Sequence, residues 1–248
     1  MSENVRPSDR VIHWMAATVV ALLVLPAVGC WVFKEWDQAH REWRYREANG
    51  RLRKVGTAVQ MYATRYDGWT PAGGMATDAS PEWSWQAQLL PFLDRDDLYR
   101  RIDFSESWNA ESNRQVASTS LDAFLNPYER NPDKRLPAAI THQAANLKVF
   151  GSRLGVDFEE VMEQDGTSST IMLGEIGAEF PPWARPGNVR DPARGLGGGP
   201  GAFGRSSGRG GWMMFMAGNA RFLPAEISPR VLELLADPNN GVPRDGEF

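Results

Sequence analysis

The sequence predicts an α+β protein in which one long N-terminal helix begins as a transmembrane segment and continues into a small globular domain. Three observations lead to this fold class. Residues 11–33 contain no charged side chain, residues 34–66 repeat apolar side chains at helical spacing, and residues 67–237 alternate short apolar runs with Gly- and Pro-rich turns. The expected segments are a polar tail (1–10), a transmembrane helix (11–33), a stalk helix (34–66), a globular domain (67–237) and a C-terminal tail (238–248).

The apolar stretch 11–33 is long enough to cross a bilayer. As a helix it rises about 35 Å, against roughly 30 Å of hydrocarbon. A helix also satisfies its own backbone polar groups in lipid. A buried core helix is the alternative, but core helices are rarely apolar on every face over this length. The stretch also carries small residues on which anchors can pack: Ala16, Ala17, Ala21, Ala27 and Gly29.

Two processing events compete with a retained anchor. Ala27-Val28-Gly29 has the small residues of a signal-peptide cleavage site, and Cys30 after it is typical of a lipoprotein signal. Against this, Pro26 stands where such signals prefer an apolar residue, and the apolar run continues to Phe33. The sequence therefore favours an uncleaved anchor, with lipidation of Cys30 left open.

The stalk continues the helix up to a strong stop signal at Asp67-Gly68. Its apolar stripe consists of Trp36, Trp43, Leu52, Val55, Val59, Tyr62 and Tyr66. Its basic residues (Arg41, Arg44, Arg46, Arg51, Arg53 and Lys54) form either a solvated face or a contact with lipid headgroups. Their number also places the domain in the cytoplasm by the positive-inside bias.

The globular domain is expected to combine short helices with four strands. Two helical turns broken around Pro91 are expected within 83–102, a short helix over 114–124, a turn over 156–162, and a last helix from Ser228-Pro229 to 236. Strands are expected at 147–150, 169–173, 212–216 and 220–223. Residues 180–211 are expected to be a surface loop, because nine glycines fall within 195–211.

Composition excludes several kinds of site. A net charge of −4 is too mild to indicate a nucleic-acid partner, and one cysteine excludes an internal disulfide. His142 is the single histidine of the domain, so a His/Cys zinc cluster is not expected, and a serine nucleophile elbow is absent from the sequence. We therefore expect no catalytic, metal-binding or cofactor-binding residues.

Four weaker signals favour ordinary structural roles. Gly199–Gly204 matches the dinucleotide fingerprint in letters alone, and Gly166–Thr170 is typical of a turn entering a strand. The acidic groups do not follow the EF-hand spacing and indicate solvated helix faces: Asp94, Asp96 and Asp97, and Glu159, Glu160, Glu163 and Asp165. Four tryptophans indicate either core packing or a surface that stacks on carbohydrate: Trp69, Trp83, Trp85 and Trp183.

Several motifs in a fixed order resemble a known family. They are LPAV (25–28), RLRKVGTAVQMYATRYDGWTPAGG (51–74), SWQAQLLPFLDRDDLYRRIDFSESWNAESN (84–113), EVMEQDGTSSTIMLGE (160–175), PPW (181–183) and GGWMMFMAGNARFLPAEISPRVLELL (210–235). Together they resemble the planctomycete family catalogued as domain of unknown function 1559, whose members look like G-type pseudopilins of type II secretion or type IV pilins. The resemblance implies a pilin-like fold, with the long helix packed on a small antiparallel sheet and the domain outside the cytoplasm.

The chain also departs from that family pattern. The Gly-Phe-Thr-Leu-Ile-Glu site of the prepilin peptidase is absent from the sequence. Ala48 and Asn126 stand where family members often have cysteines, and Ala217-Gly218-Asn219 lacks the acidic residue of the usual triplet.

The resemblance implies a non-enzymatic, single-pass protein of the cytoplasmic (inner) membrane. Residues 11–33 would contact lipid, and the protein would associate with other pilin-like or envelope proteins without peptidase processing. The alternative is an extracytoplasmic module that binds carbohydrate or a small molecule.

Overall fold

The longest element is helix α1 (Pro7–Arg65), which contributes to both compact units of the chain, residues 1–46 and 47–248. The structure, a computed structural model, describes residues 7–73, 83–129, 138–151 and 155–240, and of residues 7–13 and 16–27 it describes the backbone alone. Within these described residues, no helix has both the length and the apolar character needed to cross a membrane. Most side chains of the expected span 11–33, including Ala16, Ala17, Ala21 and Ala27, lie outside the described part of the chain.

The ends of α1 follow from its sequence. The helix is described from Pro7 onward, a residue that is tolerated in a first helical turn. It ends at Arg65, where Asp67 (φ 50°) and Gly68 (φ 89°) adopt left-handed conformations. The Gly68 N–H donates to the Ala63 carbonyl at 2.9 Å, which satisfies one of the last free carbonyls of the helix. The long N-terminal helix is present, and it ends next to the expected stop signal Asp67-Gly68.

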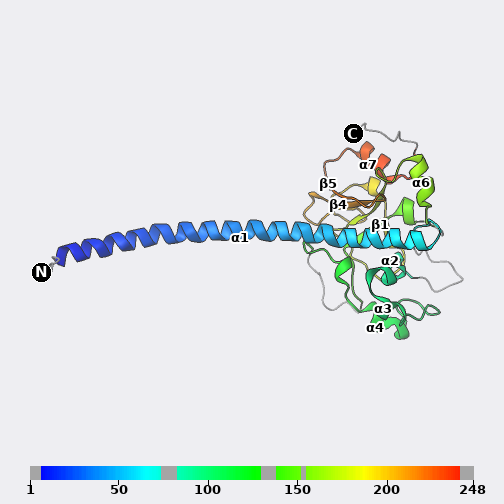
Figure 1. Cartoon of the computed structure of the whole chain (residues 1–248), viewed down its shortest axis with the longest axis horizontal. Helices are drawn as coiled ribbons and strands as arrows, with labels where there is room; N and C mark the ends of the chain where they lie inside the picture. Colours follow the sequence, from blue (N-terminus) through cyan, green and yellow to red (C-terminus); the bar gives the residue numbers. More distant parts are fainter. Residues whose placement is uncertain (1–6, 74–82, 130–137, 152–154, 241–248) are drawn as a thin grey trace. The chain divides into compact units, whose positions relative to one another are not determined.

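In the unit of residues 47–248, the last turns of α1 pack on a β-sheet (Figure 1). Leu52, Val55 and Val59 are fully buried at three- and four-residue spacing, so they form one face of the helix. Gly56 brings the helix close to the sheet, since a Cβ at this position would lie 2.3 Å from the Met214 methyl carbon.

The sheet has five strands in the order β3-β1-β2-β4-β5. The strands are β1 (Gln143–Asn146), β2 (Ile171–Glu175), β3 (Val189–Arg190), β4 (Gly210–Phe215) and β5 (Ala220–Pro224). Neighbours are antiparallel except β1 and β3, which run parallel. The expectation of a purely antiparallel sheet is therefore wrong at the β3 edge. Three of the four expected strands are present as β2, β4 and β5, with shifted ends.

Both faces of the sheet are covered, which explains the unbroken apolar run of β4. Trp212 and Met214 belong to the same buried cluster as the α1 residues. Met213 and Phe215 point to the opposite cluster, which contains Leu232 of helix α7 (Pro229–Ala236). A strand buried on two sides carries apolar residues at every position rather than at alternate ones.

The remaining helices are short. They are α2 (Trp85–Gln88), η1 (Leu90–Leu93), α3 (Asp96–Tyr99), η2 (Glu111–Asn113), α4 (Arg114–Ala117), η3 (Asp122–Phe124), α5 (Leu147–Phe150), α6 (Phe158–Gln164) and η4 (Pro192–Arg194). Pro91 lies in the first turn of η1 and does not break it, because proline is tolerated there. The single helix expected over 114–124 is two pieces, α4 and η3.

The expected strand at 147–150 is wrong: these residues form helix α5, and the strand β1 immediately precedes it. Asn146 causes the switch, since its side-chain oxygen accepts the Lys148 N–H at 3.0 Å as an N-cap. Its amide nitrogen also donates to the carbonyls of Ile171 and Ala236, both at 2.7 Å. Asn146 is thus fully buried while its side-chain amide keeps its hydrogen bonds.

The expectation of a surface loop over 180–211 is also wrong. The side chains of Trp183, Leu196 and Phe203 are at most 1% exposed, and strand β3 lies in this segment. Gly204 has φ 98°, and a Cβ there would lie 1.9 Å from the Leu196 carbonyl oxygen. The glycines therefore permit close backbone packing, which composition alone does not distinguish from disorder.

The expected C-terminal tail is packed at its beginning. Pro238 is buried, and the Asn240 N–H donates to the Asp165 carboxylate at 2.7 Å. Residues 241–248 lie outside the described part of the chain, as do residues 1–6 of the N-terminal tail.

Candidate functional site

A row of aromatic rings lies exposed on α1 within the unit of residues 1–46. Phe33, Trp36, His40 and Trp43, named here the aromatic row, follow one another at three- and four-residue spacing and so share one helix face. Successive ring centroids lie 6.2, 5.3 and 5.7 Å apart. Phe33, Trp36 and Trp43 are 65%, 61% and 52% exposed. Contiguous exposed apolar surface of this kind marks a place of contact with lipid or protein.

Charged side chains accompany the aromatic row. Asp37 and Arg41 form an ion pair, and Glu42 and Arg46 form another at 3.3 Å, each across one helical turn. Such exposed pairs stabilise a helix by only about 0.3–0.5 kcal/mol each. These charged side chains lie in water beside the aromatic row and leave its rings exposed.

His142, the candidate base of the domain, is a buried structural residue. Its Nδ1 accepts the Asn126 N–H at 2.9 Å, and its ring meets Phe180 edge to face at 4.5 Å. Burial above all, opposed by the hydrogen bond from Asn126 and aided by the nearby Arg51, lowers the pKa of His142 to about 4. A neutral imidazole held in this way is 2% exposed and does not reach a substrate.

Next to His142 lies a buried ion pair that the sequence did not identify as a site. Glu175 accepts hydrogen bonds from the Arg205 Nε, the Trp212 N–H and the Asn126 side-chain amide, each at 2.8 Å. The Arg205 guanidinium also lies 3.9 Å from the ring centroid of Tyr128. Burial raises the pKa of the Glu175 carboxyl, while Arg205 lowers it.

This ion pair connects several segments of the domain. It joins the end of β2 to the glycine-rich segment and to the start of β4. The Asn126 side-chain amide joins its own loop to the pair through Glu175. The signal available in the sequence was the Gly174-Glu175 dipeptide at a strand end, but nothing there pointed to Arg205.

Three of the four candidate carbohydrate-stacking tryptophans lie in the core. Trp85 and Trp183 are fully buried, and Trp83 is 6% exposed. The Trp85 indole N–H donates to the Asn188 carbonyl at 2.9 Å, and that of Trp183 donates to the Thr119 carbonyl at 3.0 Å. Trp69 alone is partly exposed, so the expected stacking surface is not formed by this set.

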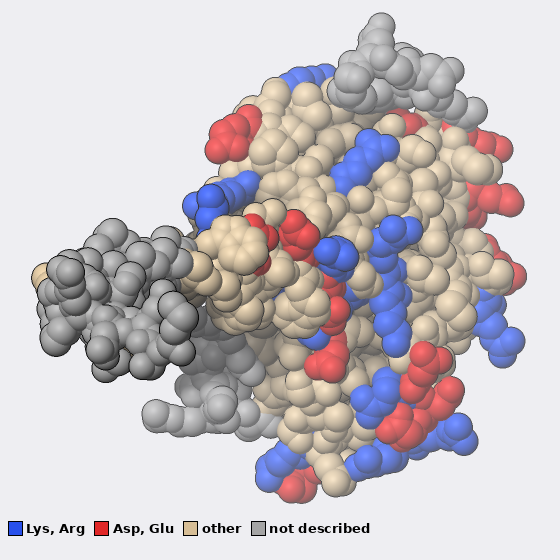
Figure 2. Space-filling model, turned by 60° about the vertical axis from the view of Figure 1, so that its left-hand side comes forward, with Lys and Arg blue, Asp and Glu red and all other residues tan. Residues whose placement is uncertain are grey.

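The other weak signals have structural positions. Gly166–Thr170 forms the expected turn before β2, and Gly199–Gly204 belongs to the packed segment before β4 rather than to a strand–helix turn. Asp94, Asp96, Asp97, Glu159 and Glu160 are exposed, whereas Asp165 is buried. Within the described residues, no group of three or more His, Cys, Asp or Glu could hold a metal ion. Figure 2 shows basic and acidic side chains intermixed on one face of the globular unit.

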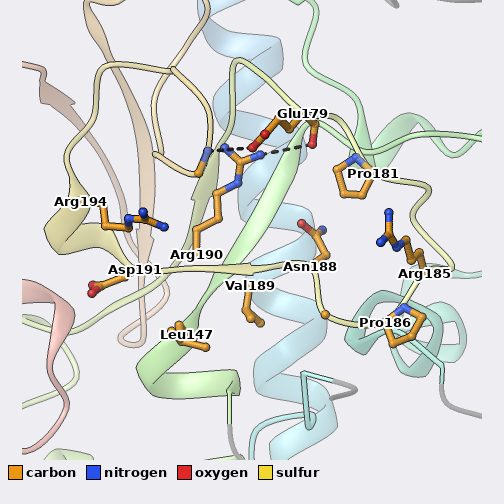
Figure 3. A pocket seen from close by; sticks show the side chains of 12 residues that line it. Leu147, Glu179, Pro181, Arg185, Pro186, Asn188, Val189, Arg190, Asp191 and Arg194 are labelled. Atoms are coloured by element: carbon orange, nitrogen blue, oxygen red, sulfur yellow. Dashed lines mark hydrogen bonds between the residues drawn. The ribbon is translucent and has the colours of Figure 1, made fainter. Parts of the chain in front are cut away.

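A polar pocket of about 500 Å³ lies beside β3 (Figure 3). It combines residues of α5, β3, η4 and the segment that joins β2 to β3. The residues that matter for its chemistry are Leu147, Glu179, Arg185, Val189, Arg190, Asp191 and Arg194. The sequence does not indicate this pocket, because most of its residues belong to the segment expected to be a surface loop.

Fold and sites together define an α+β globular unit that carries a long N-terminal helix. The family described as "Protein of unknown function (DUF1559)" matches residues 38–204, and the chain belongs to this family. The apolar stretch 11–33 lies outside the matched range. No curated protein and no solved structure matches the chain.

Proposed function

We propose that this protein is a single-pass, pilin-like envelope protein that acts by associating with other proteins and not by catalysis. The observation that carries the proposal is the aromatic row on α1, whose large apolar side chains are exposed to solvent. The last turns of α1 belong to the core of the unit of residues 47–248.

Residues 11–33 serve as the anchor in this proposal. They contain no Asp, Glu, Lys or Arg, and the backbone from Pro7 onward is helical. In this proposal the globular unit lies outside the cytoplasm, the orientation that the pilin resemblance implies. The Lys and Arg count favours the opposite side, but large domains cross membranes largely regardless of their flanking charge.

Lipid alone covers only the beginning of the aromatic row. If the span ends at Phe33, Trp36 lies about 5 Å beyond it along the helix and Trp43 about 15 Å beyond it. The headgroup region on one side of a bilayer is roughly 5–8 Å deep. Trp36 therefore fits the interfacial belt of aromatic residues, whereas Trp43 requires another covering surface. A neighbouring helix anchored in the same membrane supplies that surface.

The polar groups singled out for chemistry favour a non-enzymatic role. His142 is buried with its Nδ1 bound to the backbone, and Glu175 is bound to Arg205. Both are committed to holding strands and loops in place. Nucleophilic catalysis would instead require a nucleophile that is aligned with a base and an orienting acid.

Association along α1 is tested by photo-cross-linking in membranes. A photoreactive residue is placed at Trp36, at Trp43 or, as control, at Arg53, which is exposed on the α1 segment inside the globular unit. We expect protein adducts from positions 36 and 43 and none from position 53. Adducts absent from both aromatic positions contradict the proposal.

Processing is tested separately, since the chain lacks the peptidase site. We expect co-expression with a prepilin peptidase to leave the electrophoretic mobility of the protein unchanged. A mobility shift would show that the protein is a processed subunit, which contradicts this part of the proposal.

A further inference from the structure

We propose that the pocket beside β3 binds a small organic oxyanion, carrying a carboxylate or phosphate group, between Arg185 and Arg194. This is a binding site distinct from the association surface on α1, and it does not depend on the function proposed above. The inference comes from three arginines in one cavity, from the way Arg190 is held, and from the size of the cavity.

Arg190 places a buried positive charge in the wall of the pocket. It is 8% exposed, and its guanidinium donates to the carbonyls of Ala202 (2.5 Å), Ala178 (2.6 Å) and Glu179 (3.3 Å). Carbonyl oxygens satisfy its N–H groups without neutralising its charge, and it forms no ion pair with a residue that the structure describes. The Glu179 carboxylate acts on this guanidinium electrostatically but forms no ion pair with it. Because buried charges in proteins are usually paired directly, the position favours an anion nearby.

Arg185 and Arg194 supply the groups that can bind the anion directly. Both are exposed side chains lining the pocket, and they enter the view from opposite sides in Figure 3. Each backbone N–H has a carbonyl partner, but neither guanidinium forms a hydrogen bond or ion pair with a residue in the described ranges. A free guanidinium offers two parallel N–H donors that match the oxygens of a carboxylate or phosphate.

Two carboxylates also line the pocket, and each already has a backbone partner. One Glu179 carboxylate oxygen accepts the Gly201 N–H at 2.9 Å, and one of Asp191 accepts the Ala193 N–H at 3.0 Å. Three guanidinium groups against two carboxylates leave the lining with a net positive charge. The oxyanion is therefore attracted to the arginine side chains and kept away from the two acidic ones.

The remaining lining selects the body of the ligand. The pocket holds about 500 Å³, within the range of sites for small organic molecules. Leu147, Val189 and Pro186 contribute apolar surface beside the charged groups. A ligand with an oxyanion group on a short carbon skeleton satisfies both parts of the lining.

The test is calorimetric titration of the full-length protein in non-ionic detergent with citrate, inorganic phosphate and neutral glucose. We expect citrate or phosphate to bind, glucose not to bind, and added NaCl to weaken the binding. Binding of citrate alone assigns the site to a carboxylate, and binding of phosphate alone assigns it to a phosphate. Failure of both anions to bind at up to about 10 mM overturns the inference.

Two variants connect the binding to the pocket. Because both side chains are exposed, the double substitution Arg185→Gln with Arg194→Gln should leave the fold intact. It should weaken anion binding by at least about tenfold, the effect of losing charge-assisted hydrogen bonds. Arg100→Gln, at an exposed arginine outside the pocket, is the matched control and should bind normally. Equal affinities for all three proteins, or equal binding of glucose, contradict the site.

Discussion

Protonation linked to His142 should lower the free energy of unfolding of the globular unit in mildly acidic solution. The native state keeps the imidazole neutral down to a pKa of about 4, whereas the unfolded chain takes up the proton near the ordinary value of 6.5. The stability that this difference provides is complete above pH 6.5 and is lost as the pH falls toward 4.

The expected loss follows from these two pKa values. At pH 5 the unfolded histidine is almost fully protonated and the native one almost fully neutral. Linkage then lowers the free energy of unfolding by about 2 kcal/mol between pH 7 and pH 5, and by roughly 3 kcal/mol between pH 7 and pH 4. A domain of this size has about 5–15 kcal/mol in total, so the effect is measurable.

Urea unfolding of the full-length protein in non-ionic detergent, followed by the fluorescence of its buried tryptophans, measures this loss. The informative variant is His142→Asn, whose side-chain oxygen can still accept the Asn126 N–H. The variant is less stable at pH 7, but its change between pH 7 and pH 5 should be smaller than that of the wild type by about 2 kcal/mol. His40→Asn, at the exposed histidine of α1, controls for the loss of a histidine. An equal pH dependence of wild type and His142→Asn would refute the reasoning.

Three further predictions concern packing. Gly56→Leu should destabilise the unit by about 1–3 kcal/mol in thermal unfolding, because its side chain would displace Met214, whereas Gly50→Ala, with nothing within 4 Å, should be neutral or stabilising. Gly204→Ala should lower the free energy of unfolding in urea by more than about 1 kcal/mol, since its Cβ would meet the Leu196 carbonyl oxygen at a positive φ. Gly197→Ala, where the Cβ has nothing within 4 Å, is the control and should leave the stability unchanged. Equal stabilities of the two variants would restore the surface-loop interpretation. Glu175→Ala should cost about 3–5 kcal/mol by leaving Arg205 buried without its carboxylate, and adding Arg205→Met should recover part of the loss; a double variant less stable than Glu175→Ala would contradict this.

The elements that the sequence predicted are those whose pattern is carried by apolar spacing. Leu52, Val55 and Val59 recur at helical intervals, and Asp67-Gly68 supplies a stop signal, so the course and end of α1 were predictable. The run Trp212–Met216 predicted β4 because a strand covered on both faces is apolar throughout.

The elements that it missed are carried by polar or small residues. Strand β1 contains Gln143 and Asn146, whose burial depends on hydrogen-bond partners far along the chain. Likewise, the glycines around Gly204 permit close packing only because a particular neighbour lies against them. Apolar periodicity contains no information about either condition.

The candidate sites differ in the same way: one is visible in the local sequence, and the others form only on folding. The aromatic row is local in sequence, and the spacing of Trp36 and Trp43 already indicated a helix face. The pair Glu175–Arg205 and the pocket between Arg185 and Arg194 exist only once the sheet and the glycine-rich segment are folded together. Their residues carry no motif by which the sequence could have connected them.

The central claim, that residues 11–33 anchor a globular unit lying outside the cytoplasm, is tested most directly by protease protection. Intact spheroplasts that express the protein are treated with an external protease, and the membranes are then washed at alkaline pH. The account predicts that the globular unit is digested while a short N-terminal fragment containing residues 11–33 remains in the membrane pellet. Full-length protein that stays protected until the cells are lysed, or that leaves the membranes in the alkaline wash, would contradict it.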